Sequence, residues 1–209
     1  MQRLDTVELL DDPALSDAVV AEAYCDLART NRWLGNTRAI LRRLKGSGAR
    51  SVLDLGCGQG ALLEEIRDTL GLSVMGFDLR PAPRASVGIV TGDAVKDRLP
   101  QADVVLAVLM VHHLSEDEIV RLIRNVSHAS HRFIILDLVR HWLPLWLFRI
   151  FVAPFLSHIN AADGATSVRR AYTPRELRKI VNRAVEGTSA CVRHTAAPFY
   201  IRQIVDISW

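Results

Sequence analysis

The stretch of sequence that decides the fold is Val52-Leu53-Asp54-Leu55-Gly56-Cys57-Gly58-Gln59-Gly60. Its first half is the apolar run of a buried strand, and its second half has glycine at every other position. Glycine lets the backbone bend sharply and approach a ligand that a Cβ atom would exclude. The helix expected to begin near Gly60 adds free N–H groups in its first turn. The stretch therefore predicts a strand, a tight turn and a helix that together cradle a nucleotide-like ligand.

The glycine turn by itself leaves the ligand open. Gly56-x-Gly58-x-x-Ala61 also satisfies the dinucleotide-binding fingerprint in its G/A form. A nicotinamide cofactor and another adenosyl ligand both remain possible at this point.

Acidic residues at the ends of successive expected strands narrow the choice. Asp54 precedes the turn, where its carboxylate would repel a diphosphate and favour a cationic part of the ligand. Asp78 ends the next strand, 22 residues after Gly56, the position from which a carboxylate can accept both ribose hydroxyls. A third acid, Asp93, follows another strand. Together these acids suit an adenosine with a positively charged tail.

The ordered motifs D-L-G-C-G-Q-G, G-F-D, G-D-A, L-P-Q-A-D-V-V and V-H-H-L resemble those of the class I S-adenosylmethionine-dependent methyltransferases. The resemblance covers roughly residues 50–138 and continues more loosely to the C-terminus. It implies that the first acid and the glycine turn hold the methionine moiety, the second acid binds the ribose and the Gly-Asp pair meets the adenine. The implied S-adenosylmethionine-binding residues are Asp54, Gly56, Gly58, Gly60, Asp78, Leu79, Asp93 and Ala94.

The order of expected elements predicts an α/β fold with a doubly wound, mostly parallel seven-stranded sheet, an antiparallel C-terminal strand and added N-terminal helices. The expected strands are 51–55, 73–77, 87–91, 103–109, 132–138, 190–195 and 199–207. The expected helices are 16–31, 36–45, 60–70, 116–128 and 174–185. Capping boxes at Ser115-x-x-Glu118 and Thr173-x-x-Glu176 fix the starts of the last two helices.

A chain of 209 residues with 49% hydrophobic content is long enough for one well-cored domain. We expect a single methyltransferase domain over 1–209. Its expected parts are a helical cap at 1–48, a cofactor-binding core at 49–139, an apolar acceptor-side insertion at 140–172, and a C-terminal helix and hairpin at 173–209. The net charge of +3 is spread out and no basic block is interleaved with aromatics, so we expect no nucleic-acid partner.

Cysteine usage predicts reduced thiols and a cytoplasmic location. Cys25, Cys57 and Cys191 are too far apart to form a disulfide framework, and no H-E-x-x-H or C-x-x-C motif occurs, so no metal is expected. Residues 1–12 carry four acids and lack the apolar segment of a signal peptide. The apolar segment 142–156 is too short and too interrupted to span a bilayer. Peripheral membrane contact and a monomer or homodimer remain open.

Three histidines are candidates for a general base that removes a hydroxyl proton from the acceptor. His112 and His113 follow the expected strand 103–109 at the sheet edge where ligands bind, and His141 follows the strand 132–138. The alternative for the first two is that one imidazole caps the next helix at Ser115 while the other packs. Nearby, Asp137 and Arg140 are expected either to orient a substrate oxygen or, preferably, to form an ion pair.

The acceptor is suggested by the aromatic residues of the insertion, which are Trp142, Trp146, Phe148, Phe151 and Phe155. They favour a small hydrophobic acceptor, methylated at a hydroxyl of a phenol, quinone precursor or polyketide. The same rings would also be explained by packing on the sheet or on a partner chain. The alternatives kept open are an RNA or protein methyltransferase and a nicotinamide-binding oxidoreductase of similar fold.

Overall fold

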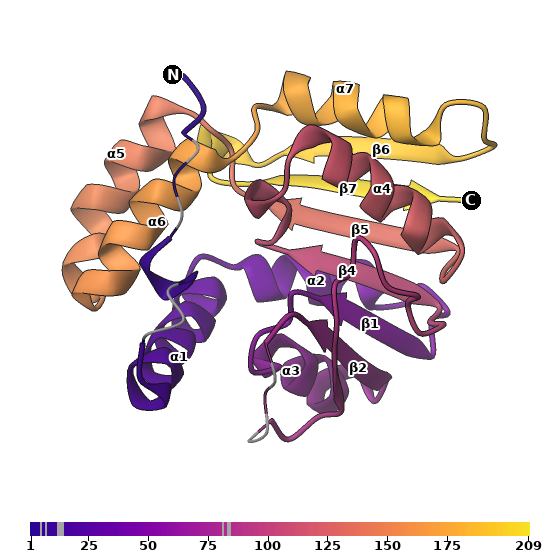
Figure 1. Ribbon diagram of the computed structural model, residues 1–209, viewed down its shortest axis with the longest axis horizontal. Helices are drawn as coiled ribbons and strands as arrows, with labels where there is room; N and C mark the ends of the chain where they lie inside the picture. The colour runs from indigo at the N-terminus through magenta and orange to yellow at the C-terminus, as the bar shows by residue number, and fades with distance from the viewer. Residues whose placement is uncertain (5, 7, 12–14, 81, 83–84) are drawn as a thin grey trace.

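The computed structural model describes residues 1–209 apart from residues 5, 7, 12–14, 81 and 83–84. Its centre is a seven-stranded sheet with the order β3-β2-β1-β4-β5-β7-β6 (Figure 1). The first five strands in this order, from β3 through β2, β1 and β4 to β5, pair in parallel. β7 runs antiparallel to both β5 and β6. The predicted fold class is confirmed. The strands are β1 Ser51–Leu55, β2 Ser73–Asp78, β3 Ile89–Thr91, β4 Val104–Val108, β5 Arg132–Asp137, β6 Cys191–Ala196 and β7 Gln203–Ser208.

The helices form layers on both faces of the sheet and a third group beyond its edge (Figure 1). They are α1 Asp17–Trp33, α2 Asn36–Leu44, α3 Ala61–Leu70, α4 Glu116–Ser127, α5 Trp142–Phe151, α6 His158–Arg170 and α7 Pro174–Val185. Short 3-10 turns lie at η1 Leu9–Asp11, η2 Val111–His113, η3 Ala153–Phe155 and η4 Pro198–Tyr200. Both predicted capping boxes are present, at the starts of α4 and α7.

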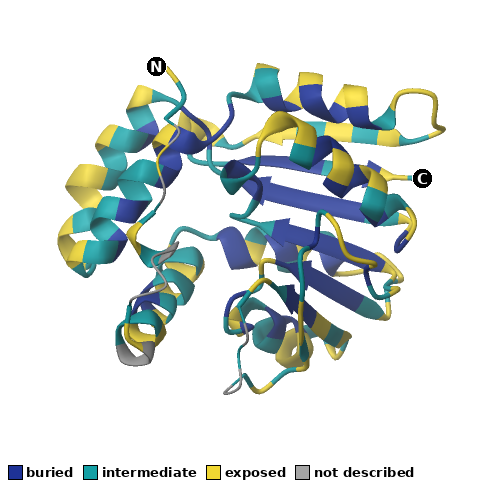
Figure 2. Cartoon of the chain, in the orientation of Figure 1, coloured by how far each residue is buried: buried dark blue, intermediate teal, exposed yellow. Residues whose placement is uncertain are grey.

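Alternation along the strands divides the core into two clusters. Leu53 and Val105 point to the face covered by α4 and α7, while their neighbours Val52 and Leu106 point to the face covered by α2 and α3. Successive side chains of a strand lie on opposite faces, so a central strand with both faces covered is apolar throughout. Figure 2 shows the central strands as a continuous buried layer.

The C-terminal hairpin differs from the prediction. Its second strand begins at Gln203 and not at residue 199, because the η4 turn occupies the connection. Phe199 and Tyr200 have φ values of +59° and +55°, a left-handed conformation that interrupts an extended strand. The apolar run of residues 199–201 is therefore part of the turn.

The parallel strands all end at the edge of the sheet beside α1, α5 and α6 (Figure 1). Loops that follow parallel strands converge there, and such edges are where ligands bind in open α/β sheets. Among the residues that the structure describes, no helix is both long enough and apolar enough to cross a bilayer.

Candidate active site

The glycine turn after β1 adopts a left-handed backbone conformation that residues other than glycine rarely take. Gly56, Gly58 and Gly60 have φ values of +69°, +56° and +82°. A Cβ atom on Gly58 would lie 2.5 Å from Cε1 of Tyr24, and one on Gly56 would lie 2.7 Å from Cγ of Met110. The first two glycines are therefore required both by conformation and by close approach of the cavity walls.

Two hydrogen bonds hold this turn against the end of β2. The Gly56 N–H donates to the Phe77 carbonyl at 2.8 Å. The Gly58 N–H donates to Oδ2 of Asp78, also at 2.8 Å, and Oδ1 of the same carboxylate accepts the Arg80 N–H at 2.9 Å. Asp78 thus fixes the turn and the loop that follows β2 together.

Asp54, which precedes the turn on β1, is a buried acid that lines the cavity. It is 3% exposed, and its Oδ1 has no hydrogen-bond partner among the described residues. Burial, together with the negative charge of Asp78, raises the pKa of Asp54 well above its usual range. Burial and the same two carboxylates also raise the pKa of the Cys57 thiol, so it is not a reactive thiolate. A cationic group placed here would satisfy Asp54 and relieve the repulsion between the acids.

A cavity of about 570 Å³ begins at these acids. Asp93 and Ala94 line it after β3, and Leu79 lies at its rim with 71% of its surface exposed. The Lys96 ammonium, which donates to the carboxylate at 2.7 Å, lowers the pKa of Asp93 despite a smaller opposing effect of burial. Gly60 does not line the cavity and instead forms the N-cap of α3.

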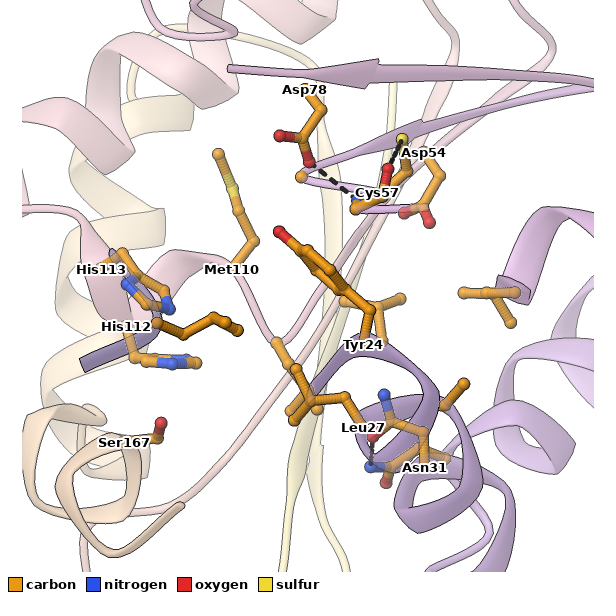
Figure 3. Close-up of a pocket in the computed structure, with 18 of the residues that line it drawn as sticks. Tyr24, Leu27, Asn31, Asp54, Cys57, Asp78, Met110, His112, His113 and Ser167 are labelled. Carbon is orange, nitrogen blue, oxygen red and sulfur yellow. Dashed lines mark hydrogen bonds between the residues drawn. The ribbon is translucent and has the colours of Figure 1, made fainter. Parts of the chain in front are cut away.

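The cavity extends from the acids to a second, mostly apolar end (Figure 3). Tyr24 of α1 and Met110 lie between the two ends, and Leu27 lies beside them on α1 (Figure 3). Other apolar lining residues come from α5, α6 and the loops next to them; they are Leu138, Phe148, Leu156 and Val168. The volume lies within the range of about 300–1,000 Å³ typical of small-molecule sites.

His112 and His113 lie at this second end of the cavity, on η2. The His112 ring nitrogen Nδ1 is 2.7 Å from Oδ1 of Asp137, and the His112 backbone N–H donates to Oδ2 of Asp137 at 2.9 Å. Burial favours the neutral imidazole, but the charges and hydrogen bonds of Asp137 and Glu8 outweigh it and raise the pKa of His112 to about 9. His112 is thus held in a fixed contact with Asp137, and the more exposed His113 is the better candidate base.

A carboxylate from the N-terminus completes this end of the cavity. Glu8 has Oε1 at 3.6 Å from Nε2 of His112 and Oε2 at 3.8 Å from Nε2 of His113. Oε1 also accepts the Ser167 hydroxyl at 2.6 Å. Burial opposes ionisation of Glu8, yet its hydrogen bond to His112 and the charges of both imidazoles lower its pKa.

Glu8 is held there by its neighbours in the N-terminal segment. The Arg3 guanidinium donates to the backbone carbonyls of Arg170, His112 and Leu114. The N–H groups of Leu9 and Leu10 donate to the Asp163 carboxylate at 2.7 and 2.8 Å. The segment is thus fastened on both sides of Glu8 to α6 and to the histidine turn.

His141 is not brought to this site. Its Nδ1 accepts the Leu143 N–H at the start of α5, and its ring stacks on Tyr200 at 5.0 Å between centroids. The predicted ion pair between Asp137 and Arg140 is also wrong. Asp137 binds His112, whereas Arg140 pairs with Glu176 and donates to the Ala171 carbonyl.

Two further expectations are settled by the contacts. Neither of the adjacent histidines caps α4, because Ser115 and Glu118 supply its capping box. Of the five aromatic side chains between residues 142 and 155, Phe148 alone lines the cavity. The other four are more than half exposed; they are Trp142, Trp146, Phe151 and Phe155.

Sequence reasoning missed Glu8 and Tyr24 as lining residues, and it left open whether Arg170 pairs with acids or closes over the site. Arg170 is 9% exposed, and its Nη2 donates to the His113 carbonyl at 3.3 Å. These residues come from segments outside the strand ends, and no spacing or motif in the sequence connects them to the glycine turn. Only the packing of α1, α6 and the N-terminal segment over the sheet edge brings them in.

Comparison with known proteins identifies the family of this chain. The family model of the O-methyltransferase domain matches residues 15–136, which is more than half of the chain. A search of curated proteins finds no match.

Solved structures share the fold at low sequence identity. The chain is similar to the plantazolicin methyltransferase BpumL in complex with SAH, with 15% identity, a TM-score of 0.67 and coverage of 92% of this chain and 91% of that one. It is also similar to human N-acetylserotonin methyltransferase in complex with SAM, with 18% identity, a TM-score of 0.62 and coverage of 90% and 55%.

The family match decides against the nicotinamide-binding oxidoreductase that the glycine turn alone leaves open. The buried, unpaired acid beside a glycine turn fits the cationic cofactor that the motifs imply. The chain belongs to the O-methyltransferase domain family and is a class I S-adenosylmethionine-dependent methyltransferase.

Proposed function

We propose that the protein transfers a methyl group from S-adenosylmethionine to a hydroxyl of a small hydrophobic acceptor, such as a phenol, quinone precursor or polyketide. The observation that carries this proposal is a cavity with Asp54 and Asp78 at one end and apolar residues, two histidines and Glu8 at the other. A cavity of about 570 Å³ favours a small acceptor over a folded RNA or protein.

The acids and the turn would hold the cofactor. Asp54 pairs with the cationic methionine end, Asp78 accepts the ribose hydroxyls, and Asp93 with Ala94 and Leu79 borders the adenine. Gly56 and Gly58 leave room for close approach of the backbone, while Gly60 starts α3. When bound, S-adenosylmethionine supplies a methyl group that its positively charged sulfur has already activated.

The remaining task of the protein is to align the acceptor and exclude water. Phe148, Leu156 and Val168 would contact the apolar body of the acceptor. His113 would take the hydroxyl proton, and His112 would stay bound to Asp137 as a fixed neighbour. His141, which the structure places outside the cavity, has no part in this mechanism.

The acceptor class can be tested directly. The purified protein is incubated with S-adenosylmethionine and a panel of apolar phenols, hydroquinones and hydroxylated polyketides, and mass spectrometry detects the gain of one CH₂ group. We expect methylation of members of this panel. RNA and peptide substrates run in parallel are the comparison, and methylation confined to them would refute the small-acceptor proposal.

Asp78→Ala is expected to weaken the binding of S-adenosylhomocysteine by about 2–3 kcal/mol, because charge-assisted hydrogen bonds to the ribose are lost. Calorimetric titration measures the change. Asp78→Asn keeps an oxygen that can accept the Gly58 N–H, so the turn should stay in place while the charged contact to the ribose is lost. This variant should therefore bind S-adenosylhomocysteine with intermediate affinity. Unchanged affinity in Asp78→Ala would show that the ribose role is misassigned.

Cofactor affinity is expected to fall as the pH falls through the raised pKa of Asp54. Burial and the charge of Asp78 raise the pKa of Asp54, and only the ionised form of Asp54 can pair with a cation. Calorimetry with S-adenosylhomocysteine across pH should show this slope, and Asp54→Asn should flatten it and lower affinity at high pH by about tenfold or more. The exposed Asp68→Asn serves as the matched control. The same slope in Asp54→Asn would contradict the role.

His113→Ala is expected to lower kcat by about 10²–10⁴-fold, the usual contribution of a general base, with little change in S-adenosylhomocysteine affinity. Turnover is measured on the best acceptor from the panel. His131→Ala, on an exposed position far from the cavity, is the matched control. If His113→Ala and His112→Ala each leave the rate unchanged, no histidine of this pair acts as the base.

A further inference from the structure

We propose that Glu8, His112 and His113 form a binding site for a divalent transition-metal ion at the acceptor end of the cavity. One carboxylate oxygen and one nitrogen from each imidazole lie within 4.8 Å of one another. No motif in the sequence indicates this site, because Glu8 lies more than 100 residues from the adjacent pair of histidines.

The distances between these atoms suit coordination. Nε2 of His112 is 3.6 Å from Oε1 of Glu8, and Nε2 of His113 is 3.8 Å from Oε2. Ligand atoms about 2.1 Å from a tetrahedral ion are separated by about 3.4 Å. The two distances to the Glu8 oxygens are close to this spacing, and the set of one oxygen and two nitrogens, which lie within 4.8 Å of one another, must draw closer around the ion.

Outer hydrogen bonds already orient two of the three ligands. Asp137 contacts Nδ1 of His112 at 2.7 Å, which leaves Nε2 directed at Glu8. The Ser167 hydroxyl donates to Oε1 of Glu8 at 2.6 Å and fixes the carboxylate (Figure 3 shows Ser167 beside His112). Metal-binding histidines usually have such a carboxylate partner on the other ring nitrogen.

The donor set indicates the class of ion. Two imidazoles and one carboxylate suit Zn²⁺, Fe²⁺, Co²⁺ or Mn²⁺ better than Mg²⁺ or Ca²⁺, which prefer oxygen ligands. Three protein ligands leave coordination positions open, and all three residues line the cavity. An acceptor hydroxyl bound at an open position would lose its proton more readily.

Metal binding is separable from methyl transfer. The base role proposed for His113 applies to the metal-free protein, and the ligand role applies to the loaded protein. Binding measured without cofactor or acceptor tests the ligand role alone. Failure to bind a metal ion would contradict the metal site and not the proposed methyl transfer. Failure to methylate phenols would contradict the proposed acceptor and not the metal site.

The test uses untagged, chelator-treated protein titrated with Co²⁺ and Zn²⁺. We expect one ion per chain by elemental analysis after dialysis, and a Co²⁺ absorption band typical of nitrogen and oxygen ligands. Glu8→Gln and His113→Ala should each weaken binding at least tenfold. Ser167→Ala keeps all three ligands and should weaken it less.

His131→Ala is the matched control and should bind the ion as the parent protein does. Thermal unfolding and S-adenosylhomocysteine binding confirm that each variant is folded. Less than one ion per chain, or stoichiometric binding that Glu8→Gln and His113→Ala leave unchanged, would overturn the proposal, since in the second case the ion would be bound elsewhere.

Discussion

The architecture of the site depends on the hydrogen bond between the Gly58 N–H and the Asp78 carboxylate. It joins the turn after β1 to the end of β2, and the backbone bond from Gly56 to Phe77 reinforces the junction. With the turn fixed, Asp54 and its unpaired carboxylate oxygen lie beside it and line the cavity. A carboxylate that accepts backbone N–H groups is held more firmly than one on the surface, because charge-assisted hydrogen bonds are the stronger ones.

The two ends of the cavity are built differently. The cofactor end comes from consecutive strand ends, so neighbouring strands of one sheet set its geometry. The acceptor end is assembled from the N-terminal segment, α1, α5, α6 and the histidine turn. Arg3 and Asp163 fasten that segment through backbone groups, which places Glu8 beside both imidazoles. In the proposed function, acceptor choice would therefore depend on parts that can vary without disturbing the sheet.

Much of the fold follows from local pattern. Apolar runs with both faces covered indicate central parallel strands, and the capping boxes at Ser115 and Thr173 fix helix starts through contacts only three residues apart. The second C-terminal strand was misplaced because residues 199–201 are apolar, while the left-handed conformation of Phe199 and Tyr200 has no clear signal in those residue types. Four of the five insertion aromatics face outward, since a run of such residues does not specify which face packs.

The sequence by itself determined the sheet, the glycine turn and the acids that follow successive strands, because each of these depends on residues close together in the chain. Tertiary structure alone decided that Asp137 binds His112 and not Arg140, that His141 lies outside the cavity, and that Glu8 lies inside it. The contacts of Asp137 with His112, of His141 with Tyr200 and of Glu8 with the histidines join residues tens to more than a hundred positions apart. Their partners are chosen by how helices and the N-terminal segment pack over the sheet edge, which no periodicity along the chain encodes.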